Sequence, residues 1–212
     1  MKTGLAVFTA VLVSSMPLKA DDMKAPADKP SAHPNEFYGG FAFGRTKIYS
    51  EATILKGTKI DDSGSGHMFF LGRELGKGWA VEGFYADLGK TEWSGKPGDR
   101  YKFKGTEYEV LIGTKATATG STNGIAGKYS WDVHRKTRLY AKLGMHSWKT
   151  KTDITHAGVT DSSKYDGTDA MGGIGVEYAI SEKVRIIAGS DNFITDDEDV
   201  SLAYVGLRFG FN

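Results

Sequence analysis

The chain has 212 residues and no cysteine, and its 27 Lys and Arg residues nearly balance 26 Asp and Glu residues. A single domain is expected at this length, and the balanced charge argues against a nucleic-acid partner. The lack of cysteine excludes a disulfide framework and a thiolate metal site.

The N-terminal segment, residues 1–20, is predicted to be a cleaved signal peptide. A lysine gives the charged start, "LAVFTAVLVSSM" the apolar run, and residues 18–20 the cleavage site. The apolar run is shorter than the ~20 residues that a spanning helix needs, which disfavours the alternative of a membrane anchor. Residues 21–35 hold three of the five prolines and are predicted to be a disordered leader. Residues 36–212 are then the folded domain.

Eight strand-like runs follow the leader. No stretch there has the roughly 18 consecutive apolar residues of a membrane helix, which excludes a helical membrane protein. Each run is near the ~10 residues that a tilted membrane strand requires. The runs are 36–48, 65–75, 78–90, 118–131, 137–150, 168–180, 183–194 and 200–212. This even number predicts an all-β fold, an eight-stranded antiparallel up-and-down transmembrane β-barrel.

The connections between the runs alternate in length. Three are tight and three are long and polar: 76–78, 132–136 and 181–183 against 49–64, 91–117 and 151–167. Short turns at one end and long loops at the other are typical of outer-membrane barrels. In the longest loop, residues 101–120 alternate in polarity, which predicts an extension of the neighbouring strands or an additional hairpin.

Alternation of side chains assigns one face of each run to lipid and the other to the lumen. In the run 168–180, Ile174 and Val176 face outward and Glu177 faces inward. Five runs offer an inward charge at mid-length, and these residues are the candidate site: Glu82, Lys128, Lys142, Glu177 and Arg185. Small barrels are filled by side chains, so these charges are predicted to pair as a polar core, and a wide pore is not expected.

Aromatic residues near the ends of the runs predict two girdles at the membrane interfaces. The predicted members are Phe37, Tyr38, Phe41, Phe43, Trp79, Tyr85, Tyr129, Trp131, Phe209 and Phe211. A soluble barrel could use the same aromatics in its core, because alternation alone does not distinguish lipid from protein.

Five segments in order carry a resemblance to a known family: "EFYGGFAFGRT", "GRELGKGWAVEGFYADLG", "RLYAKLGMHSW", "GGIGVEYAIS" and "VGLRFGFN". They resemble the transmembrane domain of OmpA-like outer-membrane proteins over about residues 36–212. The resemblance implies a place in the bacterial outer membrane, in contact with outer-membrane lipid and lipopolysaccharide. It also implies that the barrel-assembly machinery recognises the C-terminal strand.

The family has a lumen cluster of Glu, Lys, Glu and Arg that is implicated in gating a narrow, porin-like water path. The matching residues are Glu82, Lys128 and Glu177, with Lys142 at another cationic position. The position of the gate arginine holds Ile187, and Arg185, two residues away on the same face, is the expected substitute. The sequence ends after the eighth run, so the family's peptidoglycan-binding domain is not expected.

Features of other protein classes are weak. His146 and Ser147 are neighbours in a predicted strand and face opposite ways, so they do not form a nucleophile and its base, and no enzyme is expected. No histidine pair has the spacing of a helical zinc site, and the acidic runs at 61–62 and 196–199 are interpreted as solvated loop surface. Neither a metal nor another cofactor is expected.

The leading interpretation is a structural outer-membrane barrel with a charged lumen, extended in its strongest form to a narrow gated pore. One alternative is a surface adhesin or host-interaction protein whose long loops bind a host or surface ligand. Another is a soluble periplasmic barrel that binds a ligand, which would need apolar inward faces and is therefore opposed by the lumen charges.

Overall fold

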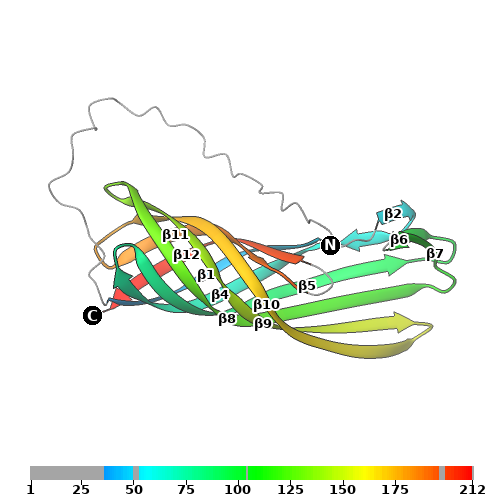
Figure 1. Ribbon diagram of the computed structural model, residues 1–212. Coiled ribbons are helices and arrows are strands. Elements are labelled where there is room, and N and C mark those ends of the chain that lie inside the picture. The colour runs from blue at the N-terminus through cyan, green and yellow to red at the C-terminus, as the bar shows by residue number, and fades with distance from the viewer. Residues whose placement is uncertain (1–35, 50–52, 104, 196–198, 212) are drawn as a thin grey trace, which may run out of the picture.

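The computed structural model describes residues 36–49, 53–103, 105–195 and 199–211. The predicted signal peptide and leader lie outside the described residues. Eight long antiparallel strands form a closed barrel (Figure 1). They are β1 (Phe37–Tyr49), β4 (Ser63–Gly76), β5 (Trp79–Gly95), β8 (Thr114–His134), β9 (Thr137–His156), β10 (Val159–Ala179), β11 (Val184–Phe193) and β12 (Asp199–Phe211).

The barrel closes between its first and last strands. β1 pairs with β12 from Phe37 opposite Phe211 to Tyr49 opposite Asp199, and each of the eight strands pairs with two neighbours in the ring. The predicted eight-stranded antiparallel up-and-down barrel is confirmed. Among the described residues there is no helix long and apolar enough to cross a membrane.

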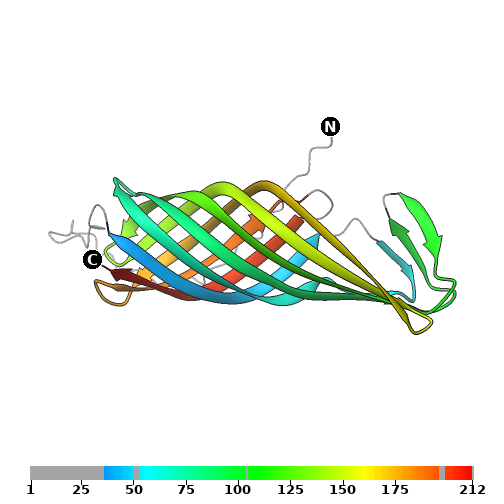
Figure 2. The ribbon, with the colours of Figure 1, turned by 90° about the horizontal axis from the view of Figure 1, so that it is seen from below.

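The two ends of the barrel differ. Tight turns connect β4 to β5, β8 to β9 and β10 to β11 at one end, called here the turn end, where β1 begins and β12 ends. The opposite end carries a three-stranded sheet of β2 (Thr53–Lys56), β6 (Arg100–Phe103) and β7 (Thr106–Glu109). The short strand β3 (Lys59–Asp61) pairs with β5 near the end of β5 that is far from the turn end. We call the described residues within 53–62, 91–119 and 149–167 the crown; it extends well beyond the barrel (Figure 2).

The prediction of a loop at 151–167 is wrong, because nearly all of this segment is strand. β9 and β10 continue to a two-residue turn at Ala157 and Gly158, which have φ angles of 48° and 80°. Positive φ at both positions is the geometry of the hairpin turn that matches strand twist. The segment is polar because water surrounds both of its faces, while its many threonines favour extended backbone. For residues 101–120 both predicted alternatives occur, since β6 and β7 form a hairpin and β8 begins as early as Thr114.

The outward face of the barrel is an apolar belt with aromatic residues at its edges. At the turn end, the ring centroids of Trp79 and Tyr129 lie 4.9 Å apart, and Tyr129 stacks on Trp131. Tyr38 was wrongly predicted as a girdle residue: it is 1% exposed and faces the lumen. The alternation that turns Phe37 outward necessarily turns its neighbour Tyr38 inward.

Candidate functional site

The structure places all five predicted lumen residues inside the barrel, where each is at most 6% exposed. It brings them together with four further buried charges that the sequence-based site lacked. The complete set, called here the charged layer, is Glu74, Glu82, Lys128, Arg138, Lys142, Glu177, Arg185, Asp191 and Arg208. Five cations and four carboxylates nearly balance, as buried charges must to offset their loss of hydration.

Glu177 is the anionic centre of the half that lies nearer the turn end. The ammonium of Lys128 donates to its Oε1. Arg208 Nη1 lies 3.5 Å and Arg185 Nε 3.8 Å from its Oε2. Arg185, the expected substitute for the family's gate arginine, thus reaches Glu177, but Arg208 lies closer. Ile187 is buried, at 4% exposure, within the apolar core cluster.

The charges continue toward the crown through Glu82. One of its oxygens lies 3.7 Å from Lys128 Nζ, and the other lies 3.2 Å from Lys142 Nζ. Lys142 also donates to Asp191 across 2.7 Å. The hydroxyl of Tyr38 donates to Glu82. Carboxylates and ammonium groups therefore alternate along a connected path.

The path also continues to the turn end. Glu74 accepts a hydrogen bond of 2.7 Å from Arg208 Nη2 and lies 3.5 Å from Arg138 Nη1. Arg138 in turn lies 3.4 Å from Asp132, whose side chain is 50% exposed. The charged layer thus reaches solvent at the turn end.

Glycines on inward faces make room for the tyrosines that separate the charges. A Cβ atom on Gly72 would lie 2.3 Å from the ring of Tyr38, and one on Gly175 would lie 2.3 Å from the hydroxyl of Tyr140. The rings also contact the cations: Lys128 Nζ lies 4.5 Å from the ring centroid of Tyr140. Such contacts stabilise a desolvated ammonium.

An apolar layer covers the charged layer on the crown side. Its buried members are Met68, Phe84, Met171, Phe193 and Leu202. Each is at most 7% exposed, so no water-filled passage runs beside these side chains. His146 lies among them, with Nδ1 2.8 Å from the Thr122 hydroxyl and Nε2 2.8 Å from the Ile194 carbonyl oxygen. The adjacent Ser147 bonds instead to Thr168 at an exposed position.

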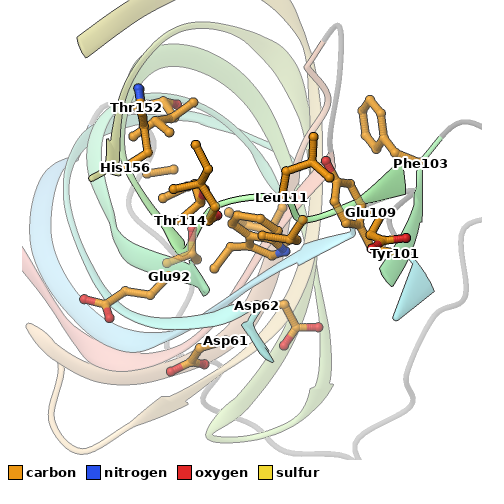
Figure 3. Close-up of a pocket in the computed structure, with 18 residues that line it drawn as sticks. Asp61, Asp62, Glu92, Tyr101, Phe103, Glu109, Leu111, Thr114, Thr152 and His156 are labelled. Atoms are coloured by element: carbon orange, nitrogen blue, oxygen red, sulfur yellow. The ribbon is translucent and has the colours of Figure 1, made fainter. Parts of the chain in front are cut away.

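Above the apolar layer, the crown encloses a pocket of about 720 Å³ (Figure 3). Ile48 lines the pocket and also packs against the buried core cluster of the barrel. Most of the lining is apolar, from Trp93, Tyr101, Val110, Leu111, Ile112, Ala116, Ala118 and Ile154. Asp61 and Asp62 stand on one side of the pocket, and Thr152 and His156 on another (Figure 3). This pocket was not predicted from the sequence, although the apolar run at 110–112 within a polar loop was a signal for it.

Glu92 of β5, which also lines the crown pocket, lies 2.5 Å from Lys90 Nζ and 2.9 Å from Lys115 Nζ. Hydrogen bonds from Lys90 and then Lys115 lower the pKa of Glu92 to about 2. Within the described part of the chain, no three His, Asp or Glu residues are grouped so that they could hold a metal ion.

Residues 6–212 match the family model of the outer membrane protein beta-barrel domain. No curated protein matches the chain. Among solved structures, the attachment invasion locus protein Ail of Yersinia pestis is 17% identical, with a TM-score of 0.55 over 84% of this chain and 99% of that one. OprG of Pseudomonas aeruginosa is 15% identical, with a TM-score of 0.52 over 87% and 100% of the two chains. The N-terminal barrel of OprF from the same organism is 15% identical, with a TM-score of 0.50 over 84% and 98%. At these identities the structures establish likeness of fold alone.

Proposed function

Because the chain belongs to the outer membrane protein beta-barrel family and lies in the bacterial outer membrane, we propose that it is a surface-binding protein whose barrel anchors a ligand-binding crown. The observation that carries this proposal is the crown pocket above a lumen filled with side chains. The proposal takes up the adhesin interpretation of the sequence in preference to the gated pore.

The lengths of the strands support a function outside the membrane. β8, β9 and β10 have 21, 20 and 21 residues, about twice the ~10 residues that a tilted strand needs to cross the bilayer. An anchor alone does not require the additional length. Loops and extensions held by a rigid scaffold are where recognition residues usually lie.

The pocket suits a small organic ligand. Its volume falls within the ~300–1,000 Å³ typical of such sites, which also combine an apolar lining with a few polar groups. Asp61 and Asp62 favour a ligand with an apolar body and a cationic or hydrogen-bond-donating group. Trp93, which lines the pocket, is a built-in fluorescent reporter.

The lumen supports a structural role for the charged layer. The cations and carboxylates contact one another, and the apolar layer separates them from the pocket. Ions crossing the barrel would have to break these contacts and pass a dry layer. We therefore infer that the resting barrel does not conduct.

One neighbour in fold supports surface recognition by barrels of this kind. Ail of Yersinia pestis is described in complex with the heparin analogue sucrose octasulfate. That ligand is anionic, whereas the pocket proposed here carries carboxylates, so the support extends to ligand binding by a barrel of this fold and not to the class of ligand.

The test uses the full chain in lipid nanodiscs and a fluorescent alkylamine as the probe. Ala116→Trp places a large ring in the pocket, and we expect at least tenfold weaker binding of the probe. The matched control is Thr117→Trp. The side chain at 117 lies on the opposite face of β8 from Ala116, so a tryptophan there leaves the pocket open. Binding that survives Ala116→Trp, or steady ion conductance of the unmodified protein in planar bilayers, would contradict the proposal.

A further inference from the structure

Strand β10 has an open edge where it extends into the crown. It pairs with β9 from Val159 to Tyr178, but its pairing with β11 begins only at Met171. A hydrogen bond from the N–H of Ile194 to the carbonyl oxygen of Ala170 adds one contact beyond that register. None of the described strands lies on the free side of residues 159–169 (Figure 1). We call residues 159–169 the open edge.

The direction of the backbone groups shows which residues are unpaired at the open edge. Along an antiparallel strand, the hydrogen-bonding groups of successive residues point to opposite sides. Ala170 presents its carbonyl group to the side of β11, whereas Ala179 donates its N–H to Lys136 on the side of β9. The register of β10 against β9 continues without a bulge. The even-numbered residues from Thr160 to Thr168 therefore direct their backbone donors and acceptors to the open side.

The open edge has few of the features that prevent strand edges from pairing. Natural edge strands are often short or bulged, contain proline, or carry lysines. The open edge has no proline and no bulge, and Lys164 is its one lysine. Asp166 follows two residues later, on the same face of the strand. A strand that offers a carboxylate to Lys164 and a cation to Asp166 is therefore a suitable partner.

The open edge is itself such a partner, because its sequence is self-complementary around the exposed Tyr165. If Tyr165 faces Tyr165 of a second copy in an antiparallel pair, Lys164 of each chain faces Asp166 of the other. Opposite charges and aromatic rings at opposed positions stabilise such a pair. In this register Thr160 faces Ala170 of the second copy, so the contact runs along the whole open edge. Even-numbered residues meet even-numbered residues, as the hydrogen bonds of an antiparallel ladder require.

The charges of β9 are compatible with this register. Lys149 lies opposite Asp166 within the chain but forms no ion pair with it. In the pair of copies, Asp166 would lie between Lys149 of its own chain and Lys164 of the second copy. Lys151, which lies opposite Lys164, is already paired with Asp153 across 2.8 Å. The two central carboxylates thus each gain a cation, and no cation is left facing another without a carboxylate nearby.

One like-charged pair occurs near each end of the contact. Asp161 would face Asp169 of the second copy. Asp169 already accepts a hydrogen bond of 2.7 Å from Trp148 Nε1, which stabilises its carboxylate. The opposite charges of Lys164 and Asp166 lie at the centre, beside the pair of Tyr165 rings. The register centred on Tyr165 therefore places its favourable pairs where the two strands are closest to their symmetry axis.

The antiparallel direction determines where the second copy lies. β10 runs from the crown toward the turn end, so an antiparallel partner has its barrel on the far side of the crown, in a membrane that faces the first (Figure 1). Two copies in one membrane would instead present β10 in the same direction and at the same level. That arrangement places Lys164 beside Lys164 and Asp166 beside Asp166, and like charges at neighbouring positions are unfavourable. The charge pattern thus favours copies in facing membranes.

We propose that the open edge of β10 pairs with the open edge of a second copy in a facing outer membrane, so that the protein joins one bacterial cell to another that carries it. A single pair of strands is a small contact, but many copies on each surface bind together and increase the total strength. No residue of the open edge lines the crown pocket, so this contact is separate from the proposed function.

The test measures the aggregation of lipid vesicles into which the full chain is inserted from outside, so that the polar crown stays outside. Lys164→Glu places a carboxylate opposite Asp166 in both strands, and we expect aggregation at least fivefold slower than with the unmodified chain. Asp166→Lys, which places two cations opposite each other, is expected to have the same effect. A mixture of the two kinds of vesicle restores opposite charges and is expected to aggregate. The matched control is Lys102→Glu, the same change of charge on an exposed lysine of β6.

A disulfide between copies reports the register, because the chain has no cysteine of its own. Tyr165→Cys places two thiols at directly opposed positions that are not hydrogen-bonded to each other, within the reach of a disulfide. We expect oxidation of these vesicles to yield a covalent dimer. Ser162→Cys is the control, since Ser162 faces Thr168 of the second copy and lies far from its own counterpart. A parallel pair within one membrane would link both variants.

Four results would overturn the proposal. They are dispersed vesicles of the unmodified chain, unchanged aggregation with Lys164→Glu, a mixture of the two charge variants that stays dispersed, and a dimer of Ser162→Cys as abundant as that of Tyr165→Cys. Probe binding in the crown pocket should be unchanged in Lys164→Glu, which separates a failure here from a failure of the pocket.

Discussion

Two carboxylates of this protein are each held between two lysines, one in the lumen and one on the crown. Glu82 lies 3.7 Å from Lys128 and 3.2 Å from Lys142, and all three side chains are at most 5% exposed. Glu92 lies closer to its lysines, at 2.5 Å and 2.9 Å, but these three side chains are 39–55% exposed.

The closer contacts are nevertheless expected to contribute less to stability. Water and salt screen an exposed pair, and holding two long side chains together costs conformational entropy. In the lumen, a charge that loses its partner is shielded from bulk solvent. The energetic consequence of an ion pair thus follows from its surroundings more than from its length.

Removing a lysine from the buried ion pairs of the lumen should have the largest effect on the free energy of unfolding. Lys128→Ala leaves Glu177 and Glu82 without their shared ammonium group, and the loss of a partner from a buried pair typically costs about 3–5 kcal/mol. We expect this decrease in the free energy of unfolding, measured by urea titration in lipid vesicles with tryptophan fluorescence. Adding Glu177→Gln should restore part of the loss. A decrease in the single variant below about 1 kcal/mol would mean that lumen water compensates the carboxylates.

The apolar layer allows a comparison with a region that carries no charge. Met68→Ala should lower the free energy of unfolding by about 2–5 kcal/mol, because Met68 is 1% exposed and its removal leaves a cavity. The same urea titration measures it. Bilayer recordings of this variant should stay silent, since the charged layer still fills the lumen below. Conductance from this single change would show that the apolar layer alone keeps the barrel closed.

Overpacking the lumen should have a smaller effect. A Cβ at Gly175 would lie 2.3 Å from the Tyr140 hydroxyl and 2.5 Å from the Ala188 carbonyl oxygen. Gly175→Ala should therefore destabilise the barrel by about 1–3 kcal/mol. Gly127→Ala is the matched control, because the nearest atom to its Cβ would be 3.8 Å away. Equal unfolding curves for the two variants would contradict the packing described for Tyr140.

Removing the exposed ion pairs of Glu92 should change the stability of the protein least. Glu92→Gln is expected to leave the unfolding midpoint within experimental error, because solvent screens the pairs it removes. The titration of Glu92 should still differ from that of a free glutamate. Its lowered pKa means that its contribution is complete above the usual value of about 4.3 and disappears as the pH falls toward about 2. NMR of the labelled carboxyl group measures this, and a midpoint near the usual value would mean that Lys90 and Lys115 do not hold Glu92 in solution.

Sequence reasoning reached the barrel because its signals are local. The two-residue alternation around Glu177 shows which face is apolar, and tight turns such as the one at Lys77 separate the strands. Alternation also places Arg208 on the inward face of its strand, but it does not show that Arg208 lies beside Glu74. Residues 134 positions apart meet there only because strands from the two ends of the chain close the ring.

The crown was less predictable for two reasons. Apolar and polar residues do not alternate in strands above the membrane, and loop composition does not reveal which segments come into contact. A strand with water on both faces loses its apolar alternation. The polar threonines and lysines of 151–167 therefore predicted a loop. The pocket forms where Trp93 meets Tyr101 across 5.4 Å, and that contact depends on how the three-stranded sheet folds back over the barrel. Composition within the loop gives no measure of that approach.

The pairing of β1 with β12 constrains how the protein can be made. The two strands lie side by side, yet nearly the whole domain separates them along the chain. Until synthesis and export have delivered Phe211, both edges of the growing sheet expose amide and carbonyl groups that hydrocarbon cannot solvate. A truncated chain that lacks β12 should therefore remain outside the bilayer. Because β12 is the last strand in the chain, the barrel is expected to insert only after β12 has been delivered.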